Sequence, residues 1–205
     1  MLQAKDFDLW ADGYDESVGL SYEEDSYPFA GYKEVLGSIY QIVMEKQHPS
    51  ILDIGFGTAT LTSKLYQHGC TIYGQDFSSR MVELACEKMP NAKLYQQDFI
   101  QGLAQPLCQK QYDYIIATYA LHHLTNESKI YFIESLLSLL KDDGKILIGD
   151  IALETQEQLQ QCQHTYSADW DDEEFYFVAD EFKKAFPNLS FMKISHCAAI
   201  ITLTK

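Results

Sequence analysis

A short apolar run that leads into an acid and two closely spaced glycines is the feature that most constrains this chain. The segment reads Ile51-Leu52-Asp53-Ile54-Gly55-Phe56-Gly57-Thr58-Ala59. The apolar run predicts a buried strand, and the glycines predict a bend because they accept backbone torsions that a Cβ would forbid. Such a bend between a strand and a helix lets the backbone approach a ligand closely, and the acid offers hydrogen-bond acceptors. The segment therefore predicts a ligand-binding crevice at one edge of an α/β sheet.

Predicted helices and strands alternate along most of the chain. Helices are expected over 28–47, 58–68, 78–89 and 126–141, and strands near 50–54, 71–75, 93–96, 112–118, 145–150, 190–196 and 199–204. This alternation predicts a parallel sheet with helices on both faces. Pro28 is expected in the first turn of a helix, and Gly69 and Gly144 just past helix ends. One domain is expected, because 205 residues is an ordinary domain length and no repeat or linker divides the chain.

Polar residues follow the next three predicted strands. Asp76 lies about 20 residues beyond the glycines, a spacing suited to hydrogen bonds with two ribose hydroxyls. Ser78 can then cap the helix that follows. Asp98 comes after the third strand and Thr118 ends the fourth. Because ligands of open α/β sheets bind beyond the carboxyl ends of the strands, we expect these residues and Asp53 to share one crevice.

Two cofactor classes use a crevice of this kind. The dinucleotide fingerprint G-x-G-x-x-G requires a third glycine, and Thr60 occupies that position here. The pattern instead resembles the first motif of the class I S-adenosylmethionine-dependent methyltransferases, with Ala59 in place of the last glycine. Three segments resemble the later motifs of that family, namely Asp76-x-Ser78-x-x-Met81, Asp98-Phe99 and residues 112–124. The chain is most similar to small bacterial members that methylate small molecules.

The resemblance implies a fold. We expect an α/β, Rossmann-like three-layer sandwich around a seven-stranded, mostly parallel sheet, with one antiparallel strand in a C-terminal hairpin. Residues 1–48 would form an N-terminal helical lid. Residues 49–150 would be the cofactor-binding half, and 151–205 would supply acceptor-side helices and the closing hairpin of a single 1–205 methyltransferase domain.

The resemblance also implies a cofactor, S-adenosyl-L-methionine (SAM), and a product, S-adenosyl-L-homocysteine (SAH). Gly55 and Gly57 would face the methionine part of SAM, and Asp53 would order its amino group or a loop water. Asp76 would hold the ribose, and Thr118 would lie next to the sulfonium. The full set of expected cofactor-binding residues is Tyr14, Asp53, Gly55, Gly57, Asp76, Phe77, Met81, Asp98, Phe99 and Thr118.

His122 and His123 are the predicted catalytic residues. They occupy the turn after the fourth strand, and an unperturbed histidine titrates near pH 6.5, which suits a general base. A base is needed only when the acceptor reaches the site protonated. The alternative is that one histidine hydrogen-bonds the backbone and fixes the turn. No metal site is expected, because adjacent side chains diverge on a helix or strand and the five cysteines are scattered.

The charge of the chain constrains its partners. The formal net charge is −15, and Arg80 is the one arginine. Nucleic acid is not expected as a partner, because phosphate binding draws on clustered lysine and arginine. No apolar run approaches the roughly 20 residues that cross a bilayer, and the acidic N-terminus is unlike a signal peptide, so no membrane contact and a cytoplasmic location are expected. Acids gathered in 1–30 and 167–181 would favour a cationic or neutral acceptor if they rim the crevice, although such loops are ordinarily solvated.

The predicted function is methyl transfer from SAM to a small-molecule acceptor by in-line displacement. One alternative is a protein that binds SAM without catalysing a reaction. It stays open because Ala59 replaces the last glycine of the motif and because no residue is an unambiguous general base. A nicotinamide-dependent Rossmann oxidoreductase is the other, and Thr60 and the terminal hairpin argue against it. Oxygen, nitrogen and sulfur acceptors are all compatible with the motifs, and no pattern indicates an oligomeric state.

Overall fold

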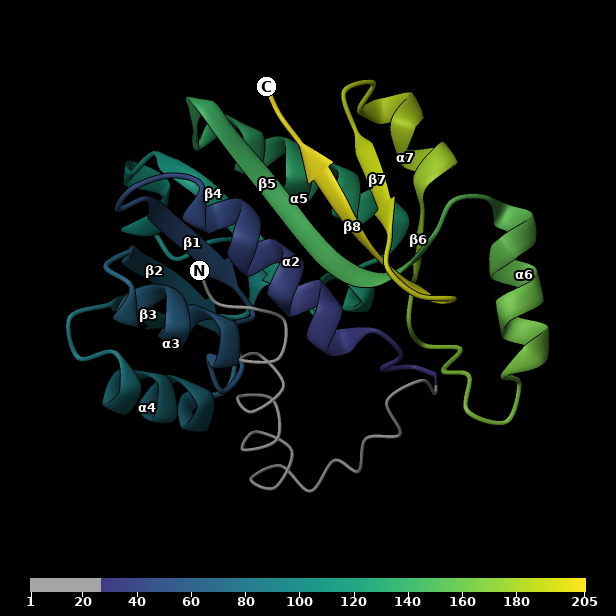
Figure 1. The fold of residues 1–205 in the computed structure, drawn as a ribbon, viewed down its shortest axis with the longest axis horizontal. Helices are drawn as coiled ribbons and strands as arrows, with labels where there is room; N and C mark the ends of the chain where they lie inside the picture. The colour runs from purple at the N-terminus through teal and green to yellow at the C-terminus, as the bar shows by residue number, and fades with distance from the viewer. Residues whose placement is uncertain (1–26) are drawn as a thin grey trace.

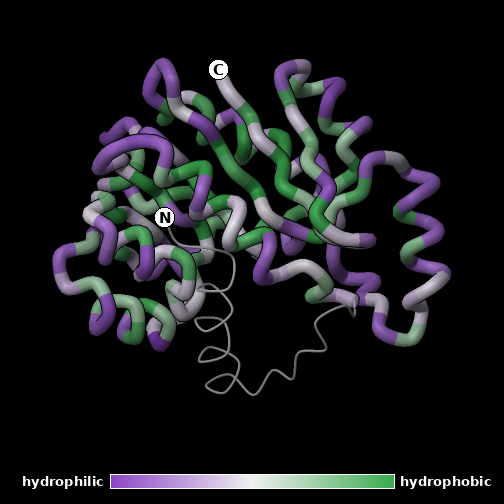
Figure 2. The backbone as a smooth tube through the Cα atoms, in the orientation of Figure 1, coloured by the Kyte–Doolittle hydropathy of each residue, from purple (hydrophilic) through white to green (hydrophobic). Residues whose placement is uncertain are grey.

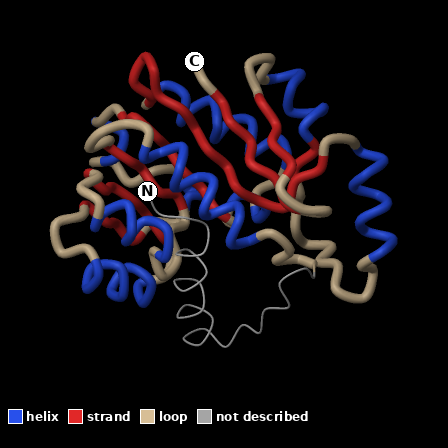
Figure 3. Tube along the Cα trace, in the orientation of Figure 1, coloured by secondary structure: helices blue, strands red, loops and turns tan. Residues whose placement is uncertain are grey.

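The computed structural model describes residues 27–205, which form a mixed sheet with helices on both faces (Figures 1 and 3). The strands are β1 (Ser50–Ile54), β2 (Thr71–Asp76), β3 (Lys93–Gln96), β4 (Tyr112–Thr118), β5 (Leu140–Leu153), β6 (Phe177–Val178), β7 (Ser190–Lys193) and β8 (Ala198–Leu203). The α-helices are α2 (Tyr32–Met44), α3 (Thr60–Gln67), α4 (Ser79–Lys88), α5 (Asn126–Ser138), α6 (Gln156–Thr165) and α7 (Ala179–Ala185). Short 3-10 helices lie in three loops: η1 (Phe99–Gln101), η2 (Leu107–Gln109) and η3 (Leu121–His123).

The strand order is β3-β2-β1-β4-β5-β8-β7. Neighbours from β3 to β5 pair in parallel, whereas β8 runs antiparallel to both β5 and β7. The predicted sheet, mostly parallel with one antiparallel strand in a C-terminal hairpin, is therefore confirmed. The structure adds the two-residue strand β6, which pairs with β5 at Ala152 and Leu153. A strand this short leaves no periodic pattern in a sequence.

Alternate residues of the central strands face opposite helix layers. On β1, Ile51 belongs to the core cluster shared with α2, α3 and α4, and Leu52 belongs to the cluster shared with α5 and α7. Both side chains are fully buried. Figure 2 shows hydrophobic residues along the strands in the middle of the molecule and hydrophilic residues on the outer helices. The predicted three-layer sandwich is confirmed.

The start of the first described helix differs from the prediction. α2 begins at Tyr32, so Pro28 lies in the preceding turn and not in the first turn of the helix. Gly31, the residue before the helix, has a φ of +79°, a left-handed conformation that separates the turn from the helix. The predicted lid falls largely on residues 1–26, and these, with Tyr14, lie outside the described residues.

The end of α5 also differs from the prediction. The helix stops at Ser138, and the chain re-enters the sheet almost at once, so Gly144 lies within β5 and not just past a helix end. Gly69 does follow α3 as predicted, with a φ of +85°. Glycine after a helix is a common C-terminal stop because it adopts this left-handed conformation without strain.

Candidate active site

The loop between β1 and α3 has a left-handed backbone at three positions. The φ angles are +68° at Gly55, +52° at Gly57 and +58° at Ala59. Gly55 also lies against the turn that follows β4, since a Cβ added there would be 2.8 Å from Cβ of Ala120. Ala59 occupies the position where the methyltransferase motif has its last glycine, and it adopts a conformation that glycine favours. The family pattern is thus retained in backbone geometry although the residue differs.

A cavity of about 220 Å³ opens beside this loop. Four of the predicted site residues line it, namely Asp53, Gly55, Gly57 and Thr118. Tyr32, at the start of α2, closes part of the opposite wall. The other described residues of the predicted cofactor set do not line this cavity: Asp76, Phe77, Asp98 and Phe99 lie at or just beyond the ends of β2 and β3, and Met81 lies in α4. That all four strand-end residues share one crevice with a ligand stays a prediction.

Asp53 is the buried acid of the cavity, with 2% of its surface exposed. The Thr62 hydroxyl donates to its Oδ2, whereas Oδ1 has no hydrogen-bond partner among the described residues. Burial raises the pKa of Asp53 to about 7, and the hydrogen bond from Thr62 only partly opposes that rise. A buried acceptor without a donor costs free energy, so Oδ1 is suited to a cationic or N–H group of a ligand.

Asp76 ties the glycine loop to the end of β2. Its Oδ2 accepts a hydrogen bond from the Gly57 amide at 2.9 Å, and its Oδ1 accepts one from the Ser78 amide at 2.9 Å. Ser78 in turn caps α4 by accepting from the Met81 amide at 3.3 Å, as predicted. Each carboxylate oxygen of Asp76 keeps a further lone pair, so both remain available to hydroxyl donors.

The ends of β2 and β3 expose two large apolar side chains. Phe77 is 67% exposed and Ile100 is 62% exposed. Asp98 starts η1 by accepting a hydrogen bond from the Ile100 amide at 2.9 Å. Phe99, in contrast, points into the core, where its ring centroid lies 6.0 Å from that of Phe132. Sequence reasoning missed Ile100, although an apolar residue just after an acid-aromatic pair is a visible signal.

Tyr119, directly after Thr118, is a second residue that sequence reasoning missed. Its φ is +49°, and its ring lines the cavity. Its hydroxyl is buried and has no hydrogen-bond partner among residues 27–205, and burial raises the pKa of Tyr119 well above its ordinary value. A left-handed tyrosine is costly in free energy and occurs most often at functional sites.

The two histidines meet in η3, in the turn after β4. His122 is buried, with Nδ1 2.7 Å from Oδ1 of Asp150 and Nε2 3.4 Å from Oε1 of Glu174. Burial alone would lower the pKa of His122, but Asp150 and then Glu174 outweigh it and raise the pKa. The ring of His123 is exposed and lies 4.3 Å from that of His122, centroid to centroid. The expected divergence of adjacent histidines is therefore wrong, because a 3-10 turn is neither a strand nor an α-helix.

Known proteins that resemble this chain in sequence or in fold include methyltransferases. Residues 51–144 match the family model of the methyltransferase domain. An uncharacterized methyltransferase of Anoxybacillus flavithermus is 38% identical over 151 residues, which span 74% of this chain and 68% of that protein. The magnesium protoporphyrin IX methyltransferase ChlM of Synechocystis PCC 6803, crystallised with SAH, aligns over 95% of both chains with a TM-score of 0.67 and 19% identity. The plantazolicin methyltransferase BpumL, crystallised with SAH and a pentazolic desmethylPZN analog, aligns over 98% of both chains with a TM-score of 0.60 and 17% identity.

The strand order and the glycine loop define the fold of the class I SAM-dependent methyltransferases. The chain belongs to the methyltransferase family, and the predicted resemblance is confirmed.

Replacing Gly55 with alanine tests the geometry of this loop. The new Cβ would collide with Ala120 and would also occupy a left-handed backbone, so we expect a stability loss above the 1–2 kcal/mol or so of backbone strain alone. We also expect SAH affinity to fall by about tenfold or more. Gly69→Ala is the matched control, because Gly69 has a φ of +85°, an added Cβ would meet only the side chain of His48, and the residue lies between α3 and β2, at the amino end of the strands. Its stability should fall chiefly through strain, and its calorimetric SAH affinity should equal that of the wild type. Equal affinities in both variants would contradict the loop assignment.

Proposed function

We propose that this protein transfers the methyl group of SAM to a small-molecule acceptor. The observation that most supports this is the unpaired Oδ1 of Asp53, a buried anionic acceptor in the wall of the glycine-loop cavity. SAM and SAH each present an ammonium group, which is the kind of donor that this oxygen lacks. An oxidoreductase that binds a pyrophosphate has no use for a buried carboxylate at this position, because the two would repel.

The remaining proposed cofactor contacts involve residues at the carboxyl edge of the sheet. Asp76 would accept from the two ribose hydroxyls with the lone pairs that the loop amides leave free. Exposed Phe77 and Ile100 would cover the adenine ring, because burial of these side chains against an aromatic base removes apolar surface from water. Asp98 would accept from the adenine amine. Phe99 would support the base from the core through its backbone.

Bound SAM supplies an electrophilic methyl group, so the protein has to align the acceptor and exclude water. Thr118 and Tyr119 line the cavity at the end of β4, and Tyr32 faces them from α2. These side chains are positioned to orient an acceptor beside the donor. A base role for the histidines stays a prediction. A general base must be unprotonated, whereas the two carboxylate neighbours of His122 favour the protonated ring.

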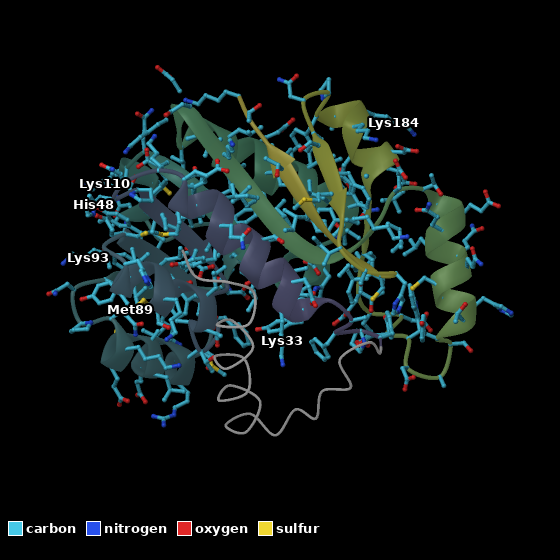
Figure 4. All side chains as sticks on the ribbon, in the orientation of Figure 1. Lys33, His48, Met89, Lys93, Lys110 and Lys184 are labelled. Carbon is cyan, nitrogen blue, oxygen red and sulfur yellow. The ribbon has the colours of Figure 1, made fainter. Side chains whose placement is uncertain are left out.

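Charge supports a small acceptor over a polymer. The chain has 15 basic residues against 30 acidic ones, and Lys93 and Lys184 project from opposite sides of the molecule (Figure 4). Binding of a phosphate backbone draws on clustered cations. Among the described residues, no helix is long and apolar enough to cross a bilayer. BpumL, which shares the fold, is solved with a pentazolic desmethylPZN analog. A cytoplasmic location remains a prediction.

Asp76→Ala tests the cofactor site. The variant removes the acceptors for the ribose and the bond to the Gly57 amide, so SAH affinity should fall by about 100-fold. Glu87→Ala, an exposed acid on α4, removes the same charge without touching the crevice and should bind as the wild type does. Isothermal calorimetry would measure both affinities, and circular dichroism would establish that both variants fold. Wild-type affinity in a folded Asp76→Ala protein would refute the ribose assignment.

A screen of acceptors tests the reaction itself. Wild-type protein with SAM should release SAH when supplied with a member of a panel of small amines, thiols and phenols, and mass spectrometry should find the product heavier by one methylene unit. Release of SAH should require the acceptor, because water is a poor competitor in an aligned site. Tight SAM binding with no product from a broad panel would favour the non-catalytic alternative. Binding of NAD in place of SAM would favour the oxidoreductase.

A further inference from the structure

Three metal-ligating side chains converge in the turn after β4, from elements far apart in the sequence. His122 and His123 come from η3, and Glu174 comes from the loop that leads into β6. One ligand atom from each residue lies within 4.8 Å of the other two. We propose that His122, His123 and Glu174 form a binding site for a divalent transition metal of the zinc type.

The spacing of His122 and Glu174 fits a tetrahedral ion. Nε2 of His122 lies 3.4 Å from Oε1 of Glu174, which is long for a hydrogen bond. Two ligands held at about 2.1 Å from one tetrahedral zinc ion lie about 3.4 Å apart. His123 is exposed, so its side chain has room to rotate its nitrogen into the third position. The pair is therefore spaced for an ion between its atoms.

Both of these ligands already have the outer partners that metal sites use. Asp150 holds Nδ1 of His122 at 2.7 Å, which fixes the ring and directs the lone pair of Nε2 outward. The Tyr176 hydroxyl donates to the second carboxylate oxygen of Glu174 at 2.8 Å, and the Tyr27 hydroxyl donates to Tyr176 at 2.7 Å. A carboxylate–histidine pair and a hydrogen-bonded carboxylate are the supports that orient metal ligands.

The backbone holds the loop and the turn together. The Phe175 amide donates to the carbonyl of His122 at 2.8 Å, and the Lys129 ammonium donates to the carbonyl of Phe175. The charged groups around the histidines are Asp150, Glu174 and Lys129, with Asp171 also acting on His123. Carboxylates outnumber the single lysine, so the local charge favours a cation.

The number of ligands indicates what such an ion would do. Three protein ligands leave one tetrahedral position open, as in catalytic zinc sites, whereas structural sites use four. η3 follows Thr118 and Tyr119, which line the cavity. If the proposed function holds, the open position would take the nucleophilic oxygen, nitrogen or sulfur of the acceptor, and the ion would lower the pKa of that group. The acceptor class is then a small molecule with a metal-binding heteroatom.

Metal titration of the full chain tests the site directly. Protein stripped with a chelator should bind one equivalent of Zn²⁺ by calorimetry, and Co²⁺ should give the intense visible absorption of a tetrahedral complex. His123→Ala and Glu174→Gln should each weaken Zn²⁺ binding by more than about tenfold, and Asp150→Asn by about 10–100-fold. His164→Ala, which removes an exposed histidine on α6, should leave Zn²⁺ affinity unchanged. Absence of stoichiometric binding, or wild-type affinity in both ligand variants, would overturn the proposal.

The same variants separate this site from the cofactor site. His123→Ala and Glu174→Gln should retain SAH affinity, and Asp76→Ala should retain Zn²⁺ affinity. Loss of Zn²⁺ binding in Asp76→Ala, with its fold intact, would mean that the ion binds elsewhere and would overturn the metal site. Stoichiometric Zn²⁺ binding that depends on His123 and Glu174 supports the site even where the acceptor screen yields no product, so failure of the proposed function would be seen separately.

Discussion

Burial of the Asp53 carboxylate is the constraint around which the crevice is organised. A carboxylate in the protein interior is costly in free energy unless donors surround it, and here Thr62 satisfies only one of the two oxygens. Asp113, on the neighbouring strand β4, is also buried, but its carboxylate is fully paired. Lys141, Lys46 and Ser50 donate to it. These donors outweigh the effect of burial and hold the pKa of Asp113 well below its usual range. One acid is paired with cations within the fold, and the other keeps an oxygen without a hydrogen-bond partner among the described residues.

The sheet topology explains why the unpaired acid lies at the carboxyl edge of the strands. β1 lies between β2 and β4, so the strands that follow it in the sequence are added on both of its sides. Ligands of such sheets bind at the carboxyl end of the strand where the order changes direction. The loop after β1 is then fixed from two directions. Asp76 holds the Gly57 amide from β2, and Ala120 packs against Gly55 from the turn after β4. Gly55 can approach Ala120 this closely because it carries no Cβ.

Much of this could be predicted from sequence because the signals are local. Apolar runs that end in Asp53, Asp76 and Thr118 mark strand ends, and parallel strands bring such ends together. The parts that could not be predicted depend on contacts between distant segments. Phe99 turns into the core because α5 offers Phe132, which no local pattern reveals. β6 exists because the chain returns to β5 after a long excursion.

The histidine turn shows the same limit at a functional position. Its place next to the crevice was predictable, but its geometry was not, because a 3-10 turn brings adjacent rings together where a strand would part them. Glu174 and Asp150, which face His122 from either side, are 52 and 28 residues away in sequence. Only the folded chain assembles them.

The most direct test of this account is the pKa of the Asp53 carboxyl, measured by carbon-detected NMR on selectively labelled protein with and without SAH. The free protein should show a pKa of about 7, because burial disfavours the charged form. With SAH bound, the ammonium next to Oδ1 should lower the pKa toward its ordinary range, so SAH affinity should rise as the pH increases toward 7. A pKa that does not move when SAH binds would contradict the assignment of Asp53 to the cofactor.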